Sequence, residues 1–183
     1  IPRGQKFISG FFPPDFVTNI DEIISGLNES LWMTVTSTVV GIALSIPIGL
    51  GAAKNLAPAP VYYFCRSVLA TSRSFQEVIV AIFMVKLFGF GPFAGFITLV
   101  IATIGFYGKL LAEDIEDMDP VQAEAVKATG SSWLQWINYA VQPQVMPRMI
   151  GLGLYRLDIN FRESAVLGIV GAGGIGVVLN NAF

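Results

Sequence analysis

Residues 30–53 read SLWMTVTSTVVGIALSIPIGLGAA, and this run decides the fold class because it contains no charged side chain. Its 24 residues lie between Glu29 and Lys54. As a helix the run would be about 36 Å long, whereas the hydrocarbon core of a bilayer is about 30 Å thick. The sequence therefore predicts a tilted transmembrane helix over residues 30–53.

Small residues recur at every fourth position of this predicted helix, at Ser37, Gly41, Ser45 and Gly49. Such a stripe lets the backbone of a second helix come close. A lipid-facing helix with incidental glycines is the alternative, and the regular spacing favours the packing stripe. Pro47 is expected to kink the helix near its end.

Three further segments are predicted to span the membrane, at about residues 62–88, 92–112 and 144–163. Two of them, 62–88 and 144–163, carry several charged side chains and therefore cannot face lipid all round. We expect an all-α, multi-pass helical bundle over residues 29–183. Residues 1–28 are expected to form an interfacial segment on the outer side, because residues 11–16 (FFPPDF) combine aromatic side chains with prolines; an extended linker is the alternative.

Composition supports a membrane protein and excludes several other classes. Charged residues make up 13% of the 183, against about 25% in a typical soluble domain. A net charge of −2 without a basic block excludes nucleic acid as a partner. The chain has no histidine and a single cysteine, Cys65, so we expect no cysteine-based metal site, no internal disulfide and no histidine-based catalytic pair.

The orientation follows from lysine and arginine, which are enriched on the cytoplasmic side of membrane proteins. If the predicted spans alternate, the basic residues near span ends fall on one side, and they are Lys54, Arg66, Lys109, Lys127 and Arg148. This side is therefore predicted to be cytoplasmic. The loop of residues 119–143 then lies in the cytoplasm.

Two short helices are predicted within residues 119–143. Asp119 is a good N-cap, Pro120 suits the first helical position, and Gln122 can complete a capping box. Gly130 is expected to stop this first helix.

The second short helix is predicted to begin after Ser132, which can form a capping box with Gln135, and to end before Pro143. Trp133 and Trp136 are expected to anchor it to the membrane face.

Several motifs resemble those of ABC importer permeases. Glu124-Ala125-Val126, followed by Gly130 and then by Pro147, resembles the EAA loop of that superfamily. Further blocks over nearly the whole chain resemble its phosphonate/phosphite branch, and they lie at residues 11–16, 89–95, 128–130, 142–147, 154–156 and 170–176. Glu163 departs from the small polar residue usual in similar permeases. The family's first and last transmembrane segments are expected before Ile1 and after Gly176.

The resemblance implies the type I importer fold, with a cytoplasmic coupling helix that docks on an ATPase. The residues expected to carry this coupling are Glu124, Ala125, Ala128 and Gly130. No phosphate-binding G-x-x-x-x-G-K-[ST] loop occurs in the sequence. We therefore expect no cofactor on this chain, and we expect ATP and magnesium on a partner ATPase dimer.

Ionisable residues within the predicted spans are candidates for a substrate path, because charges inside a membrane are costly. Arg73 and Glu77 are one helical turn apart and could pair, as could Asp158 and Arg162. Structural salt bridges are the alternative interpretation. The path residues that the resemblance favours for a phosphorus oxyanion are Arg73, Glu77, Arg156, Asn160 and Arg162.

The glycines near the end of the chain, Gly171, Gly173, Gly174 and Gly176, include a G-x-G-x-x-G pattern. A dinucleotide site is rejected, because that pattern requires a strand–turn–helix unit and an acidic residue about 20 positions later. These glycines are instead expected to allow tight packing or irregular backbone at an outer gate.

The function expected from the resemblance is that of a permease subunit in the cytoplasmic membrane of a bacterium, importing phosphonate, phosphite or a related oxyanion. The expected partners are the ATPase dimer, a second permease copy, an external (periplasmic or extracellular) binding protein and membrane lipid. Two alternatives remain at this stage. One is an intramembrane enzyme acting on lipid through carboxylates such as Glu77, Asp158 and Glu163, and the other is a non-transporting scaffold.

Overall fold

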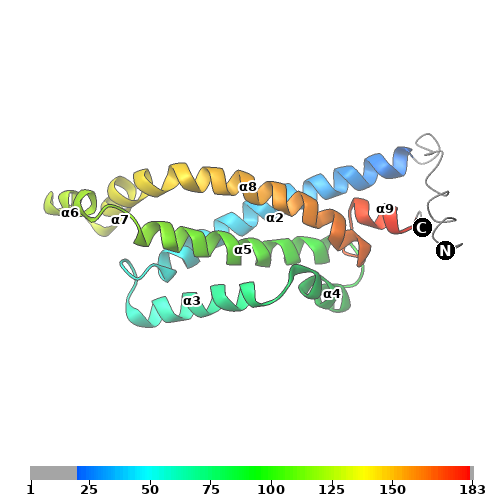
Figure 1. The fold of residues 1–183 in the computed structure, drawn as a ribbon, viewed down its shortest axis with the longest axis horizontal. Helices are drawn as coiled ribbons and strands as arrows, with labels where there is room; N and C mark the ends of the chain where they lie inside the picture. Colours follow the sequence, from blue (N-terminus) through cyan, green and yellow to red (C-terminus); the bar gives the residue numbers. More distant parts are fainter. Residues whose placement is uncertain (1–19, 182–183) are drawn as a thin grey trace, which may run out of the picture.

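The computed structural model describes residues 20–181, which form helices and short connections, with no strand in that range. Three long helices, α2 (Ile20–Ala52), α5 (Pro92–Glu116) and α8 (Gln142–Ile169), pack against one another along the bundle (Figure 1). The shorter elements are α3 (Ala59–Ser74), α4 (Glu77–Phe88), α6 (Pro120–Ala128), α7 (Trp133–Trp136), the π-helical turn η1 (Ile137–Val141) and α9 (Ile175–Asn181). Helices α6 and α7 lie at one end of the bundle and α9 at the other (Figure 1).

The predicted small-residue stripe of α2 is confirmed as a packing surface against α5. A Cβ atom added to Gly41 would lie 2.6 Å from Thr103 Cβ, and one added to Gly49 would lie 2.7 Å from Leu111 Cδ2. Ser45, on the same stripe, is fully buried. The absence of side-chain bulk therefore sets how closely the two helices approach.

Within residues 20–181, α2 and α5 are long and apolar enough to cross a membrane. The bent pair α3–α4 is a third if it is taken as one span. Helix α8 runs beside α2 and α5, but its 28 residues include the charged side chains near its middle, such as Arg156 and Asp158, which lower its hydropathy. The fourth span over 144–163 thus stays a prediction, carried by the position of α8 in the bundle.

The single helix predicted over residues 62–88 is wrong, because the chain bends by 92° between α3 and α4. Phe75 and Gln76 have extended backbone at the break. Neither proline nor glycine marks this position. Polar side chains on either side of the break are instead held by other helices, since Ser72 Oγ donates to the Ile101 carbonyl at 2.6 Å and Glu77 forms an ion pair with Arg156.

Other predicted boundaries also need correction. Helix α2 begins at Ile20, so residues 20–28 are helical and are not part of a separate interfacial segment; residues 11–16 lie outside the described residues. Pro143 does not follow a helix end, because it lies in the first turn of α8, which continues from η1.

Candidate functional site

Helix α6 stands at the end of the bundle, and its local sequence explains its bounds. Asp119 caps it by accepting the Val121 N–H at 2.9 Å, and Pro120 occupies the first turn. Gly130 follows the helix with φ +78°, a left-handed conformation that glycine adopts without strain. The predicted N-cap and stop signals are therefore confirmed.

The residues predicted to contact an ATPase share one property in the structure, which is that they are exposed. They are Glu124, Ala125, Ala128 and Gly130. Ala123, on the opposite side of α6, is buried against the bundle. The structure thus places Glu124, Ala125 and Ala128 on the exposed side of α6, with Gly130 exposed just after the helix ends.

Trp136 supports α6 from beneath and is not a membrane-face anchor as predicted. Its side chain is 6% exposed, its Nε1–H donates to the Ala123 carbonyl at 2.9 Å, and Lys127 Nζ lies 5.0 Å from its ring centroid. Trp133, by contrast, is exposed. The two tryptophans differ because the capping box of Ser132 and Gln135, confirmed here, starts a helix that turns Trp136 toward α6.

Gln144 supplies a second tie between α6 and α8 that sequence reasoning missed. Its Oε1 accepts the Asp119 N–H at 2.9 Å, while its Nε2 donates to the Ala140 carbonyl at 3.0 Å. The capping box predicted for Gln122 is therefore replaced by a partner 25 residues away from Asp119. A contact at that separation leaves no local signal in the sequence.

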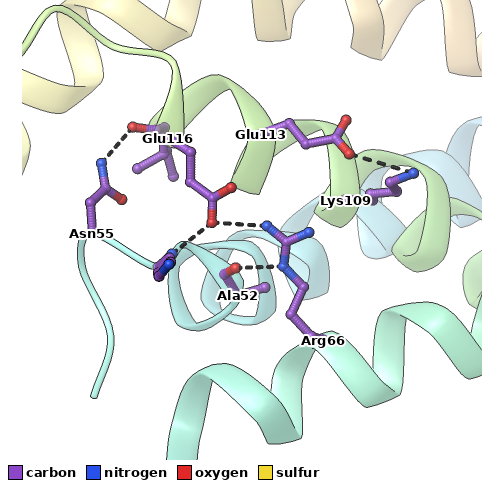
Figure 2. A network of polar contacts seen from close by, with 8 residues as sticks. Ala52, Asn55, Arg66, Lys109, Glu113 and Glu116 are labelled. Carbon is purple, nitrogen blue, oxygen red and sulfur yellow. Dashed lines mark hydrogen bonds and ion pairs between the residues drawn. The ribbon is translucent and has the colours of Figure 1, made fainter. Parts of the chain in front are cut away.

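Glu116, the last residue of α5, joins α5 to the end of α2 and to the middle of α3 (Figure 2). Its Oε1 accepts the Lys54 backbone N–H at 2.7 Å and Arg66 Nη2–H at 2.9 Å. Arg66 Nε in turn donates to the Ala52 carbonyl at 3.0 Å. One carboxylate thereby connects the end of α5 to the end of α2 and to α3.

The surrounding polar contacts lie at the same end of the molecule. Asn55 Nδ2 donates to the Ile115 carbonyl at 2.8 Å, which is a second tie between the α2–α3 connection and α5. Lys109 and Glu113 form an ion pair of 3.4 Å within α5 (Figure 2). The five basic residues predicted to be cytoplasmic are thus on the elements that converge near α6.

A buried polar cluster lies where α4, α5 and α8 meet α2. Arg156 is 3% exposed, its Nη2 pairs with Glu77 Oε1 at 3.1 Å, and its Nε donates to Thr103 Oγ1 at 3.2 Å. Asn160 is fully buried, and its Nδ2 donates to Thr103 Oγ1 at 3.0 Å and to Thr38 Oγ1 at 2.8 Å. The structure therefore brings together three of the five predicted path residues, and it adds two threonines that the sequence did not single out.

Arg73 and Arg162 are outside this cluster. The predicted pair of Arg73 with Glu77 is wrong, because the break at residues 75–76 separates them and Glu77 pairs with Arg156. Arg162 pairs with Asp158 at 2.6 Å, as the spacing predicted, and both side chains are exposed on α8. If α8 spans the membrane as predicted, this exposed ion pair requires water or protein next to it, since lipid would not solvate the charges.

The glycine-rich segment connects α8 to α9 at the opposite end from α6. Gly171, Gly173 and Gly174 all have positive φ, between +79° and +87°. The segment is tied down, because Gly91 N–H donates to the Gly171 carbonyl at 3.0 Å and Ile175 N–H donates to Ser30 Oγ at 2.9 Å. This irregular backbone lies between two helices, which agrees with the rejection of a dinucleotide site.

Comparison with known proteins shows the family. Residues 45–183 match the model of the binding-protein-dependent transport system inner membrane component. The chain is 41% identical over 168 residues to the phosphate-import permease protein PhnE of Mycolicibacterium smegmatis, covering 91% of this chain and 32% of that protein. It is 39% identical over 180 residues to the phosphite transport system permease protein PtxC of Stutzerimonas stutzeri, covering 98% of this chain and 65% of that protein. The chain thus spans about a third of the first relative and just under two thirds of the second.

The fold agrees with that of a solved importer. An inward-facing structure of the MetNI methionine ABC transporter superposes with a TM-score of 0.79 at 22% identity, covering 88% of this chain and 80% of the matched chain. The bundle described here is therefore an ABC importer permease fold. On the evidence of the family match, this chain is a bacterial, multi-pass member of the family of binding-protein-dependent transport system inner membrane components.

Proposed function

We propose that this chain is the permease subunit of an ATP-driven importer for phosphonate, phosphite or a related phosphorus oxyanion. Support for the substrate class comes from relatives whose names specify phosphate and phosphite and which align over nearly the whole chain. The observation that carries the transport role is the exposed, alanine-rich face of α6, whose free side chains are small enough to enter a groove of another protein.

The proposed partners are an ATPase dimer bound at α6, a second copy of the permease and an external binding protein. ATP and magnesium belong to the ATPase, and this chain holds neither. Closure of the ATPases would displace the two copies of α6, and the bundles would then switch between outward-facing and inward-facing states. The glycine-rich segment at the far end of the bundle is proposed to belong to the outer gate.

The proposed path runs past the buried polar cluster. Arg156, Glu77 and Asn160 place hydrogen-bonding groups in the membrane interior, and Arg162 lies on the exposed side of the same helix as Arg156. Arg73 lies on α3 just before the break. Because guanidinium groups suit oxyanions, these arginines would make a phosphorus oxyanion tolerable at this depth.

The first experiment is copurification of the ATPase with the permease. Glu124→Arg is expected to abolish it, because the variant places a long cation on the docking face. Glu113→Arg, on α5 and outside the docking helix, is the matched control and is expected to retain the ATPase. Loss of the ATPase in both variants, or in neither, would contradict the docking role of α6.

The second experiment identifies the cargo. The complex is reconstituted in liposomes with its binding protein, and ATP hydrolysis is measured with methylphosphonate, phosphite or phosphate. Stimulation by at least one of them, together with its accumulation, is expected. A complex that hydrolyses ATP but responds to none of the three would contradict the substrate class, while an intact complex with no transport of any solute would favour the scaffold alternative.

A further inference from the structure

We infer that Glu116 is a positioning residue that makes the end of α2, the middle of α3 and the end of α5 move as one body when α6 is displaced. The inference rests on the proposed function, because it concerns how ATPase motion reaches the spans. Its basis is the network of Figure 2, in which one carboxylate oxygen accepts hydrogen bonds from the Lys54 backbone and from Arg66.

Glu116 lies directly before the linker that leads to α6. Helix α5 ends at Glu116 and α6 begins at Pro120, so residues 117–119 alone separate the carboxylate from the coupling helix. A displacement of α6 therefore reaches the chain at Glu116 before any other part of α5. Met118 within this linker packs against the apolar core, which leaves the linker little freedom to absorb the motion.

A displacement of α6 can also reach the rest of the bundle by a second route. On its other side α6 is tied to the α7–α8 segment by Trp136 and Gln144. That route moves α8. Helices α2 and α3 have no covalent connection to α6 except through α5, and the bonds of Glu116 to the Lys54 N–H and to Arg66 attach both of them at the point of entry.

Asn55 provides a neutral tie between the α2–α3 connection and α5, but it does not reach α3. Arg66, in contrast, bonds both Glu116 and the Ala52 carbonyl, and so it holds α3 to the end of α2 as well as to α5. The carboxylate and this guanidinium together close a three-helix clamp. Glu116 is its central member because the Lys54 N–H, just past α2, and Arg66, on α3, donate to the same oxygen.

The stability and the positioning role of this clamp can be separated. The side chains of Arg66 and Glu116 are 29% and 30% exposed, and ion pairs with that access to water contribute little to folding stability. Removal of the carboxylate is therefore expected to leave the protein folded and the ATPase bound. What it changes is the transmission of a displacement between helices.

Glu113 is a matched control on the same helix. It is one turn before Glu116 and also forms an ion pair, but its partner Lys109 belongs to α5 itself (Figure 2). Glu113→Ala removes a similar charge without releasing a second helix. Glu116→Gln is the conservative variant, because its amide oxygen can still accept both hydrogen bonds.

The first test measures the ratio of solute accumulated to ATP hydrolysed, in liposomes containing the whole transporter with its binding protein. With methylphosphonate or phosphite as the probe, Glu116→Ala is expected to lower this ratio by about twofold to thirtyfold, the range for residues that carry coupling. Glu113→Ala and Glu116→Gln are expected to keep it close to the wild-type value. An unchanged ratio in Glu116→Ala, or an equal fall in Glu113→Ala, would overturn the inference.

The second test needs no transported solute. In a Cys65→Ser background, spin labels are placed at Phe64 on α3 and at Asp117 directly after α5, both of which are exposed. In the wild-type complex the distance between them is expected to stay the same when the ATPases are trapped closed with ATP and vanadate. In Glu116→Ala the distance is expected to shift or its distribution to broaden on trapping, and an identical response in both proteins would overturn the inference.

These outcomes keep the inference apart from the proposed function. If the wild-type transporter accumulates no phosphorus oxyanion, the proposed cargo fails and the spin-label distances alone decide the role of Glu116. If the wild-type protein transports and Glu116→Ala behaves like it in both tests, the proposed function stands and the inference fails.

Discussion

Arg156 lies buried among α4, α5 and α8 with protein acceptors on two of its nitrogens. Its guanidinium carbon is also 5.4 Å from the Phe106 ring centroid, a favourable contact for a cation. An arginine held in this way supports the structure whether or not solute passes it. Experiments on Arg156 variants must therefore distinguish the loss of its ion pair with Glu77 from the loss of a binding group on the substrate path.

Arg156→Ala is expected to cut uptake while the complex with the ATPase still forms. It also leaves the Glu77 carboxylate without its partner, which should lower the free energy of unfolding by about 3 kcal/mol, near the lower end for a buried pair because Glu77 is half-buried. The measurements are uptake in liposomes and thermal unfolding of the purified permease.

The double variant Glu77→Gln with Arg156→Ala provides the control. It removes both charges, so most of the lost stability is expected to return while uptake stays low. Recovery of uptake together with stability would show that Arg156 serves structure alone. Normal uptake in the single variant would contradict the path altogether.

At the residue scale, local signals predicted some features and long-range contacts escaped prediction. Asp119 and Gly130 act on their own neighbours in the chain, and their capping roles follow from residue type. The partners of Glu77 and Trp136 depend on which helices come together, and no spacing rule contains that information. Thr103 was missed for the same reason, since a threonine inside an apolar span resembles any other helix-packing residue.

At the scale of elements, the contact between α2 and α5 is the one most clearly set by sequence. Gly41→Ala would place a Cβ atom 2.6 Å from Thr103 Cβ, and such overpacking costs about 1–3 kcal/mol. The melting temperature of the purified permease is therefore expected to fall.

Gly151→Ala, in α8, is the matched control for this substitution. A Cβ added there meets no neighbouring atom within 4 Å among the described residues. Its melting temperature is expected to stay the same or rise slightly, because alanine favours a helix over glycine. Equal losses in the two variants would show that the tight approach at Gly41 is not what stabilises the pair.

Helix α6 depends on Trp136, and this dependence is also testable. Trp136→Phe keeps an aromatic ring but loses the hydrogen bond to the Ala123 carbonyl, a bond worth about 1 kcal/mol. Less ATPase is expected to copurify with this variant, because α6 is held less firmly. Trp133→Phe, at an exposed position, should copurify a normal amount; a reversed ranking of the two variants would place the anchor at Trp133.

The break between α3 and α4 is the element-scale feature that the sequence did not reveal. The hydrophobic pattern of residues 62–88 is that of one helix, and no proline or glycine interrupts it. The bend is explained by the different partners of its two sides. Ser72, at the end of α3, bonds to α5, whereas Glu77, at the start of α4, pairs with Arg156 on α8, so α3 and α4 point in different directions. The hydrophobic pattern of a segment contains no information about such contacts with other helices, so it cannot predict this break.

For the whole molecule, charge predicts orientation. The end of the bundle that carries α6 also carries the ion pairs of Lys109 and Arg148. Phe90 lies at the opposite end, on the loop before α5 that contacts the glycine-rich segment, and its side chain is 86% exposed. By the positive-inside rule, the α6 end is predicted to face the cytoplasm.

Labelling with a membrane-impermeant maleimide tests this orientation in intact cells that express the Cys65→Ser protein. Phe90→Cys is expected to react from outside. Tyr139→Cys in η1 is expected to react only after the cells are permeabilised. The opposite pattern would invert the topology and place α6 out of reach of any cytoplasmic ATPase.

The general architecture could be predicted from the apolar runs, because a long uncharged stretch has few stable states other than a membrane helix. The relative placement of the helices could not, since it depends on pairings such as Glu77 with Arg156 that join residues 79 positions apart.

The π-helical turn η1 determines which way the side chains of α8 face relative to those of α7. A π turn holds one residue more than an α turn, so it absorbs an inserted residue without rotating the helix on either side. Deleting a single residue within Ile137–Val141 should regularise the turn and leave both Trp136 and Arg156 facing their partners. The same deletion a few turns later would rotate everything beyond it by about 100°, so length variation among homologous permeases should concentrate at this turn and be avoided in the helix that follows.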